Sequence, residues 1–559
     1  MNKNLYLLFH KIFILIHQIY TKIKIIKTLK NKNIMADIKL LLSLIVLILS
    51  IIIYLTYNIK SNPNYIPETI EKIKNIQSIL SLSKTYDYDI IIVGSGLAGL
   101  SAAYEANDIS NGSLKICILE QEPKYGGNSM KATSGINMLN SPLQKKENIK
   151  DSFDLFFNDT RKSGKYINDI NLVSTLVNDS TDIYNYFTKQ KADLSKLGIL
   201  GGHSVKRTLR PTKFPVGFHL TSTTYKNIQN NPNIKIYLNT TVTDLIYSKK
   251  NNQVEGVYYY KSDNINKIKY IKSKTVILAT GGFGHDFSDE NSLLKKYVPR
   301  LMKFPTTNGP QTKGIGMKIA FKIGAYAVDM EQVQLHPTGF VDLNNRYDNH
   351  KILAPELIRG VGAILINQNG KRFCNELGPR DYVSQRIIKN CNLAHTDIIK
   401  QYEAFVILNQ EGIDEYGGNI LFYVNKGLLR KYTIENFCEE FKLNYTQVIL
   451  TLEQYNKDCE NKIDEFGKTV FPRKFNLSNY IYAGIVSPSI HYTMGGIKIN
   501  KDGEIINVDG KVIKGLYGAG EVTGGVHGGN RLGGNSLLEC AVFGRRCARS
   551  AYQFIKDLK

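Results

Sequence analysis

The stretch from Asp87 to Ala103 constrains the fold of this chain more than any other. It reads DYDIIIVGSGLAGLSAA: a β-branched run, three glycines spaced G-x-G-x-x-G, and an Ala-rich segment. The β-branched run is typical of a strand buried on both faces. A strand, a glycine turn and a helix in this order are the signature of a dinucleotide-binding unit. The stretch therefore predicts an α/β domain organised around a parallel sheet.

Each part of this motif has an expected role. Gly94 allows a tight turn, Gly96 lets a pyrophosphate approach the backbone, and Gly99 lets the helix pack closely on the strand. The helix N-terminus presents free N–H groups to the phosphates. A second strand, Lys115–Leu119, ends in Glu120, whose carboxylate can bind ribose hydroxyls. The alternative is an ordinary glycine-rich turn, which the flanking strand and helix disfavour.

Length, charge and cysteine usage narrow the class of protein. The 559 residues exceed the roughly 250–300 that one core accommodates, so we expect more than one domain. The formal charge of +23 comes from lysines spread along the whole chain, so nucleic acid is not an expected partner, although the positive field would attract small dianions. The seven cysteines form no CxxC pair, which leaves zinc ribbons, thioredoxin chemistry and c-type haem unsupported. No metal site is predicted.

The first 84 residues are expected to form a targeting or membrane-anchor segment and a linker. Residues 1–34 hold seven lysines and no acid, and Leu40–Tyr57 is an uncharged run long enough to span a bilayer as a helix. The lysine asymmetry places the catalytic part on the non-cytosolic side, in the ER lumen or the mitochondrial intermembrane space. A cleaved signal peptide, or a presequence for mitochondrial import, is the alternative.

The rest of the chain divides into three predicted segments. Residues 85–327 form the first part of the nucleotide-binding domain, with one amphipathic helix over Asp151–Thr188 and a β-layer around Ile234–Tyr260. Residues 328–492 alternate helices and short strands and form a second domain. Residues 493–559 return to the first domain through a strand at Gly515–Tyr517, a glycine-rich turn, and a helix that begins near Ser536.

Four motifs follow one another in this order: GSGLAG, ATGG, HYTMGG and AGEVTGGVHGGNRLGGN. Together they resemble the flavoprotein family of fumarate reductases and succinate dehydrogenases, and are most similar to its soluble, yeast-like and flavocytochrome c-like branch. The resemblance covers Tyr86–Lys559. It implies an α/β fold, in which a Rossmann-like FAD-binding domain carries an inserted α+β capping domain, after the N-terminal transmembrane or signal segment.

The resemblance also implies roles for seven side chains. Arg380, in NELGPRD, matches the proton donor to the substrate, and Glu356 and Arg359, in ELIR, match its proton relay. The substrate-binding residues it implies are His336 and Gln334, in QLHPT, together with His491 and Arg531. From spacing alone, Glu356 and Arg359 lie three residues apart and can meet on one helical face.

FAD is the implied cofactor, and it should be non-covalent because Asn128 stands where the quinone-linked members carry a flavin-linked histidine. One departure is Pro355, which replaces a threonine found before the relay glutamate in many members. The expected FAD-binding residues are the following: Gly94, Ser95, Gly96, Ala98, Gly99, Glu120, Gly127, Asn128, Ser129, Ala279, Thr280, Gly281, Gly520, Glu521, Asn535, Ser536 and Leu537.

The implied reaction is the reduction of fumarate to succinate, by hydride from N5 of reduced FAD and a proton from an arginine. No haem module is present, so the electron donor is external, either reduced free flavin or another molecule. Rival substrates are urocanate, methacrylate, a ketosteroid or aspartate; three predicted carboxylate ligands favour a dicarboxylate. A flavin-binding membrane protein without activity is a further alternative, which the intact Arg380, His491 and Arg531 disfavour.

Overall fold

The computed structural model of the chain describes residues 86–288, 290–394, 399–417 and 420–558. These residues fall within one compact unit, Tyr86–Lys559. Among the described helices, none is long and apolar enough to cross a bilayer. The apolar run Leu40–Tyr57, and with it the predicted membrane anchor, lies outside the described residues.

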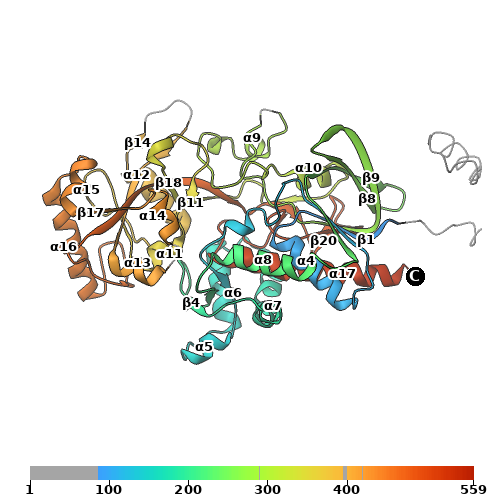
Figure 1. The fold of residues 1–559 in the computed structure, drawn as a ribbon, viewed down its shortest axis with the longest axis horizontal. Coiled ribbons are helices and arrows are strands. Elements are labelled where there is room, and N and C mark those ends of the chain that lie inside the picture. Colours follow the sequence, from blue (N-terminus) through green and yellow to red (C-terminus); the bar gives the residue numbers. More distant parts are fainter. Residues whose placement is uncertain (1–85, 289, 395–398, 418–419, 559) are drawn as a thin grey trace, which may run out of the picture. The chain divides into compact units, whose positions relative to one another are not determined.

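The first sheet contains the dinucleotide-binding motif (Figure 1). Its parallel core has the order β21–β9–β1–β2–β6, and β20, β8 and β7 add antiparallel pairs. Val93 lies opposite both Leu119 and Leu278, so the carboxyl ends of three strands meet at one edge. The strands are β1 (Tyr88–Val93), β2 (Ile116–Leu119), β6 (Ile234–Tyr237), β7 (Thr240–Ser248), β8 (Gln253–Lys261), β9 (Asn264–Leu278), β20 (Glu504–Ile506) and β21 (Val512–Gly518).

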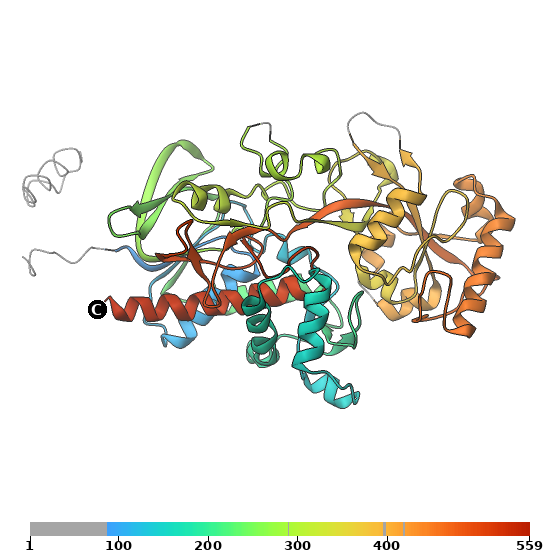
Figure 2. The same ribbon diagram turned by 180° about the vertical axis from the view of Figure 1, so that it is seen from behind.

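Two helices far apart in sequence, α4 (Leu97–Ile109) and α17 (Asn535–Asp557), pack on each other beside this sheet (Figures 1 and 2). Their approach depends on glycine. A Cβ on Gly544 of α17 would lie 2.4 Å from the carbonyl oxygen of Ala98 in α4. Glycine also allows the close contact of α4 with β1, because a Cβ on Gly99 would lie 2.1 Å from the carbonyl oxygen of Gly94, in the turn after the strand. The C-terminal helix therefore packs directly against the helix of the nucleotide-binding motif.

The single helix expected over Asp151–Thr188 is two helices, α6 (Phe153–Ser163) and α7 (Ile170–Lys189). The chain turns between them because Lys165 and Tyr166 adopt positive φ angles of 57° and 63°. Asp169 then caps α7, accepting hydrogen bonds from the backbone N–H groups of its first turn. The remaining helices of this part are α5 (Pro142–Lys146), α8 (Val216–Ile228), α9 (Leu293–Tyr297) and α10 (Ile315–Lys322).

A second, six-stranded sheet is antiparallel and is built from residues between 333 and 493. Its longest strand, β18, runs from this sheet toward the first part of the chain (Figure 2). The strands are β11 (Val333–Phe340), β12 (Ile352–Leu353), β13 (Ile364–Ile366), β16 (Ala404–Asn409), β17 (Arg430–Tyr432) and β18 (Ile481–Thr493). The helices are α11 (Glu356–Gly360), α12 (Arg380–Asn390), α13 (Gln410–Tyr416), α14 (Leu421–Asn425), α15 (Ile434–Glu440) and α16 (Tyr445–Asn461).

Three small sets of strands and three short 3-10 helices complete the described fold. A three-stranded set joins β10 (Ala327–Val328), β19 (Gly496–Lys498) and β22 (Thr523–Gly524), and another joins β3 (Ile136–Asn137), β4 (Lys196–Gly198) and β5 (Thr208–Arg210). A two-stranded set pairs β14 (Leu393–Ala394) with β15 (Gln401–Tyr402). Short 3-10 helices span Ser129–Lys131, Pro299–Leu301 and Leu343–Asn345.

A buried charge network ties the second sheet to the segment after α16. The Glu376 carboxylate, fully buried, accepts hydrogen bonds from Arg372 Nε at 2.9 Å and from Lys468 Nζ at 2.7 Å, and Arg372 also reaches Asp464 at 2.8 Å. Burial alone would raise the pKa of Glu376, but the two cations lower it to about 2. This carboxylate therefore contributes to stability only while it is ionised.

We predict that Glu376→Gln lowers the free energy of unfolding by about 3–5 kcal/mol, because two buried cations lose their counterion. Glu460→Gln is the matched control: that carboxylate pairs with Lys474 at the surface, where a pair contributes about 0–1 kcal/mol. Because the folded pKa of Glu376 lies below the unfolded one, its contribution is complete above pH of about 4.5 and is lost as the pH falls toward about 2. Urea unfolding at several pH values measures both effects; equal losses in the two variants would contradict the prediction.

Candidate active site

A cavity of about 630 Å³ lies at the carboxyl ends of β1, β2 and β9. In open α/β sheets, ligands bind at this edge, outside the carboxyl ends of the strands. Its lining includes most of the residues expected to bind FAD: Gly94, Gly96, Ala98, Glu120, Gly127, Asn128, Ser129, Ala279, Thr280, Gly281, Gly520, Glu521, Ser536 and Leu537.

The first turn of α4 fits a pyrophosphate. Gly94 has φ of +102°, and a Cβ there would lie 2.4 Å from the carbonyl oxygen of Ala279. Gly96, at the N-cap, makes no side-chain cap, and no acidic residue lies in the first turn of α4. The N–H of Leu97 donates to Ser129 Oγ at 3.2 Å, and the other N–H groups of this turn, with the positive end of the helix dipole, can bind an anion in the cavity.

Three expected FAD-binding residues do not line the cavity, and each has a structural contact instead. Ser95 donates through its N–H and hydroxyl to one oxygen of Glu120, at 2.8 and 2.6 Å, and so holds that carboxylate at the cavity edge. Gly99 serves the contact between helix and strand described above. The Asn535 side chain is fully buried and hydrogen bonds to Asn137 and Thr160.

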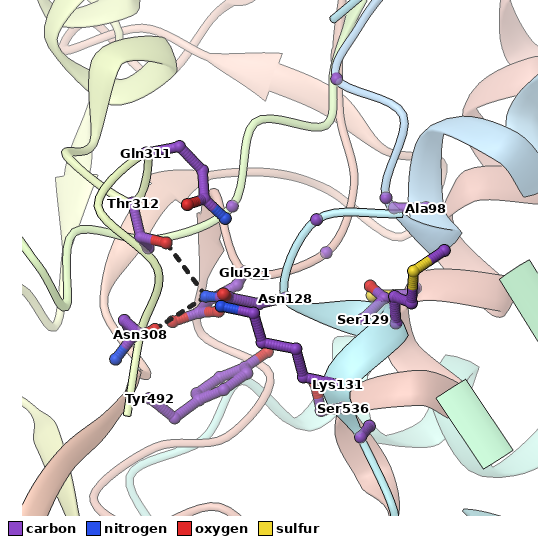
Figure 3. A pocket seen from close by; sticks show the side chains of 18 of the residues that line it. Ala98, Asn128, Ser129, Lys131, Asn308, Gln311, Thr312, Tyr492, Glu521 and Ser536 are labelled. Atoms are coloured by element: carbon purple, nitrogen blue, oxygen red, sulfur yellow. Dashed lines mark hydrogen bonds between the residues drawn. The ribbon is translucent and has the colours of Figure 1, made fainter. Parts of the chain in front are cut away.

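Asn128 connects the FAD-binding turn to a segment that the sequence did not identify, residues 306–314 (Figure 3). Its amide nitrogen donates to Asn308 Oδ1 at 2.8 Å and to Thr312 Oγ1 at 3.0 Å, and its oxygen accepts from the N–H of Gly309. Asn308, Gln311 and Thr312 also line the cavity. The polar, glycine-containing run TTNGPQTKG directly before α10 is the signal that could have revealed this wall.

Glu521 adds a half-buried acid to the cavity wall near Tyr492 (Figure 3). One of its oxygens accepts from the N–H and the hydroxyl of Thr493, at 3.0 and 3.1 Å. Burial raises the pKa of Glu521 to about 7, against the smaller lowering effect of these hydrogen bonds. The group therefore changes charge near neutral pH.

Pairing of β11 with β18 brings His336 and His491 together. His336 lies opposite Ser489, and the two imidazole rings are 5.0 Å apart at an angle of 63°. The N–H of Thr338 donates to His336 Nδ1, so the ring carries its proton on Nε2, and that atom is buried with no hydrogen-bond partner. Burial and the nearby Arg380 lower the pKa values of both histidines, so both rings are neutral at pH 7.

Arg531 lies at the same end of the cavity, in the loop before α17. Its guanidinium carbon is 4.4 Å from the centre of the Tyr492 ring, and its Nε is buried without a partner. Burial and then the like charge of Arg380 lower the pKa of Arg531 to about 10, so it stays cationic at neutral pH. An unpaired donor on a buried cation is suited to a carboxylate ligand.

Arg380, the first residue of α12, is fixed by two side chains and also lines the cavity. Its Nε and Nη2 each lie 2.8 Å from Glu356 Oε2, and its Nη1 donates to Gln334 Oε1 at 3.0 Å. Burial would raise the pKa of Glu356, but the charges of Arg380 and Arg359 lower it to about 2. Arg380, the expected proton donor, is therefore buried and paired with Glu356, and it is not part of a surface ion pair.

Gln334 was expected to bind substrate, but it does not line the cavity. Its amide nitrogen donates to Asn530 Oδ1 at 2.6 Å and to the carbonyl oxygen of Arg531 at 3.1 Å, while its oxygen accepts from Arg380. Gln334 is therefore a bridge that sets Arg380 and the Arg531 loop at a fixed separation.

Arg359 and Glu356 share α11, but the expected contact between them is not an ion pair in the described residues. Glu356 is engaged by Arg380 and, through Oε1, by the N–H of Gly201 at 2.7 Å. Arg359 Nη1 donates to the carbonyl oxygen of Glu376, and its Nε and Nη2 are buried without partners. A helix of five residues leaves the side chain of Glu356 free to turn toward stronger partners.

A family model described as the FAD binding domain matches residues 89–537. The chain is 39% identical over 478 residues to fumarate reductase 1 of Saccharomyces cerevisiae, covering 82% of this chain and 98% of that protein. It is 37% identical over 481 residues to the fumarate reductase of Schizosaccharomyces pombe, covering 84% and 90%. This chain belongs to the FAD-dependent fumarate reductase family.

Structural comparison supports the same membership. The open conformation of a flavocytochrome c3 fumarate reductase aligns with a TM-score of 0.67 and 30% identity, covering 86% of this chain and 81% of that one. The expected fold and cofactor class are thereby confirmed: this chain is an α/β flavoprotein that uses FAD, and an oxidoreductase acting on CH–CH bonds.

Gly201 also belongs to the site of this fumarate reductase family member, although the sequence alone did not identify it as a site residue. We predict that Gly201→Ala lowers kcat at least about tenfold with little change in KM for fumarate, because the new Cβ would lie 2.8 Å from Glu356 Oε1 and displace the carboxylate behind Arg380. Gly198→Ala is the matched control on the same segment, since the nearest atom to its Cβ is 3.9 Å away. Steady-state kinetics with FAD content measured in each variant give the answer; a Gly201→Ala enzyme as fast as the control would refute it.

Proposed function

We propose that this chain reduces fumarate to succinate, with non-covalent FAD and an external electron donor. The observation that carries the proposal is the convergence of Arg380, Arg531 and His491 in the lining of the cavity that holds the pyrophosphate cradle, with the ring of His336, which does not itself line the cavity, 5.0 Å from that of His491. The two yeast relatives carry the same activity in their names. The proposal identifies the substrate, the proton donor and the direction of the reaction.

The charges at this end of the cavity favour a small dianion. Two buried arginines and two neutral histidines face or adjoin it, and Arg531 Nε and His336 Nε2 have no partner in the described residues. A carboxylate accepts two parallel hydrogen bonds from a guanidinium, and fumarate carries a carboxylate at each end. A substrate without a second carboxylate would leave buried donors unpaired, which costs free energy.

The reaction adds one hydride and one proton across the carbon–carbon double bond. When bound, FAD supplies the hydride to one alkene carbon. Arg380 gives a proton from its guanidinium to the other carbon, and Glu356, 2.8 Å away, takes part in restoring it. An arginine is a weak acid because its pKa exceeds about 12, so the transfer depends on the negative charge that develops on the substrate carbon. The surrounding cations stabilise that charge.

Arg359 completes the proposed relay on the far side of Glu356. Its charge lowers the pKa of Glu356, and two of its nitrogens are buried without protein partners. Buried polar atoms in this state commonly bind an internal water. We assign Arg359 the role of returning protons to Glu356, across such a water where the two side chains do not touch.

Two further features belong to this proposal. The Asn128 amide is engaged by Asn308, Thr312 and Gly309, and an amide nitrogen is a poor nucleophile, which supports non-covalent FAD. The uncharged run Leu40–Tyr57, with lysines before it, supports a membrane anchor that leaves the catalytic part on the non-cytosolic side. Proteolysis of sealed vesicles tests that orientation: degradation without detergent would contradict it.

A substrate panel tests the proposed function. The purified full chain, with reduced viologen or reduced free flavin as donor, should reduce fumarate faster than urocanate, acrylate or methacrylate, and should oxidise succinate much more slowly. Acid precipitation of the same preparation should leave the FAD in the supernatant. A faster rate with a monocarboxylate would overturn the dicarboxylate assignment, and yellow precipitate would overturn non-covalent binding.

The proton-donor assignment predicts that Arg380→Gln loses turnover by about 10²–10⁴-fold or more, while FAD content and dicarboxylate binding persist. Arg531→Gln should instead weaken dicarboxylate binding as well as turnover, since it removes a bidentate partner. Asp381→Asn is the matched control, because the neighbouring Asp381 pairs at the surface with Lys165 and its loss should leave the rate near normal. An Arg380→Gln enzyme within about tenfold of wild type eliminates the assignment.

A further inference from the structure

The β8–β9 hairpin carries exposed apolar side chains that the catalytic function does not use. Every residue from Lys261 to Tyr270 is exposed. Ile265 and Ile268 are each 62% exposed, Tyr270 56% and Tyr258 39%. Single exposed apolar residues are common, but four on one hairpin mark a contact surface.

The strand register gathers three of these side chains on one face. Tyr258 of β8 lies directly opposite Tyr270 of β9, and Ile268 precedes Tyr270 by two residues. Residues directly opposite, and residues two apart on one strand, share a face. Tyrosines at the rim of an aliphatic patch are typical of side chains at a membrane interface.

Lysines without acidic partners lie on both faces of the hairpin: Lys272 shares the face of Tyr270, whereas Lys267 and Lys269 lie on the opposite face, with Ile265. Lys261, Lys267, Lys269 and Lys272 are exposed, and in the described residues none forms an ion pair with a carboxylate. The single acid between residues 256 and 272 is Asp263, at the turn. Each lysine near an anionic bilayer contributes about 1 kcal/mol of attraction, so the hairpin suits a negatively charged surface.

The base of the hairpin is joined to the point where the chain enters the described region. The N–H of Asp87 donates to the carbonyl oxygen of Lys272 at 3.0 Å, and the N–H of Lys272 donates to Asp87 Oδ2 at 2.9 Å. Both figures show β8 and β9 at the same end as the start of β1. Only residues 58–85 separate this point from the uncharged run Leu40–Tyr57.

Two simpler explanations account for part of the pattern. Lysines on an unpaired strand edge prevent edge-to-edge association, but they do not explain Ile265 and Ile268. Basic and aromatic residues together also bind single-stranded nucleic acid, yet the most exposed apolar groups here are aliphatic and offer no stacking surface.

We propose that the β8–β9 hairpin is a docking element for an anionic phospholipid surface. Ile265, Ile268 and the two tyrosines enter the interfacial layer, and the lysines contact the headgroups. The inference is independent of the chemistry at Arg380. It adds to the proposed anchor a second contact, which holds the catalytic part against the bilayer.

The chain contains no tryptophan, so one introduced residue reports its surroundings without background. In the full chain incorporated into vesicles, the emission of Ile268→Trp should shift to shorter wavelength and be quenched by brominated acyl chains. Both effects should occur with phosphatidylserine in phosphatidylcholine and be much smaller with phosphatidylcholine alone. Leu450→Trp, at an exposed site on α16, is the control and should report water throughout.

Charge reversal provides the second test. Lys267→Glu with Lys269→Glu should lower the ratio of docked to undocked hairpin about fivefold or more for each charge removed, in the Ile268→Trp background. Lys389→Glu with Lys457→Glu, two exposed lysines on α12 and α16, should leave it unchanged. None of these substitutions should alter fumarate reduction in detergent solution, so a failure here is distinct from a failure of the proposed function.

Three outcomes overturn the docking proposal. One is an Ile268→Trp emission that is the same with and without anionic vesicles, or the same in neutral ones. Another is a shift produced by single-stranded RNA in place of vesicles, which would assign the hairpin to nucleic acid. The third is a shift that grows with protein concentration alone, which would assign the strand edge to a second copy of the chain.

Discussion

The buried ion pair between Arg380 and Glu356 is the interaction on which the rest of the site depends. Arg380 begins helix α12, where the helix dipole disfavours a cation, and Glu356 offsets both that effect and the burial. The N–H of Gly201 holds the other oxygen of Glu356, and Gln334 holds Arg380. Segments from four parts of the chain therefore meet through one carboxylate and one guanidinium.

The site contains more positive charge than its own acids balance. Arg359, Arg380 and Arg531 are buried together, with Glu356 the one carboxylate in direct contact with any of them in the described residues. The two histidines stay neutral because burial and Arg380 lower their pKa values, which avoids further repulsion. Such an excess is unfavourable in the protein alone and becomes favourable when a dianion enters. The charges of the side chains in the site thus indicate the charge of its ligand.

The sequence correctly predicts the features that depend on contacts between residues close together in the chain. Gly99 packs against the carbonyl oxygen of Gly94, a few residues before it in the chain, so the spacing of the two glycines is sufficient to predict the strand, turn and helix. Gly201 acts on Glu356, 155 residues away, and no local pattern reveals that contact. The helix predicted over 151–188 fails for a local reason, because left-handed residues after Gly164 interrupt an otherwise continuous amphipathic pattern.

The contact expected between Glu356 and Arg359 shows a second limit of prediction from sequence. Helical spacing puts two side chains on one face, but it does not say which of several partners each will choose. In a helix of one turn, the tertiary contacts to Arg380, Gly201 and Glu376 decide. The residue types predicted which side chains belong to the site, but only the fold shows which of them contact one another.

Strands β11 and β18 carry the two site histidines on one paired ladder, with His336 opposite Ser489 and Gln334 opposite Tyr492. Side chains alternate between faces along a strand, so a deletion of one residue upstream of His491 would turn it to the opposite face rather than shorten the site. A change in the length of either strand should therefore disturb the site as much as a substitution of either histidine. Natural variation in chain length should accumulate in the loops between them and be absent from the ladder.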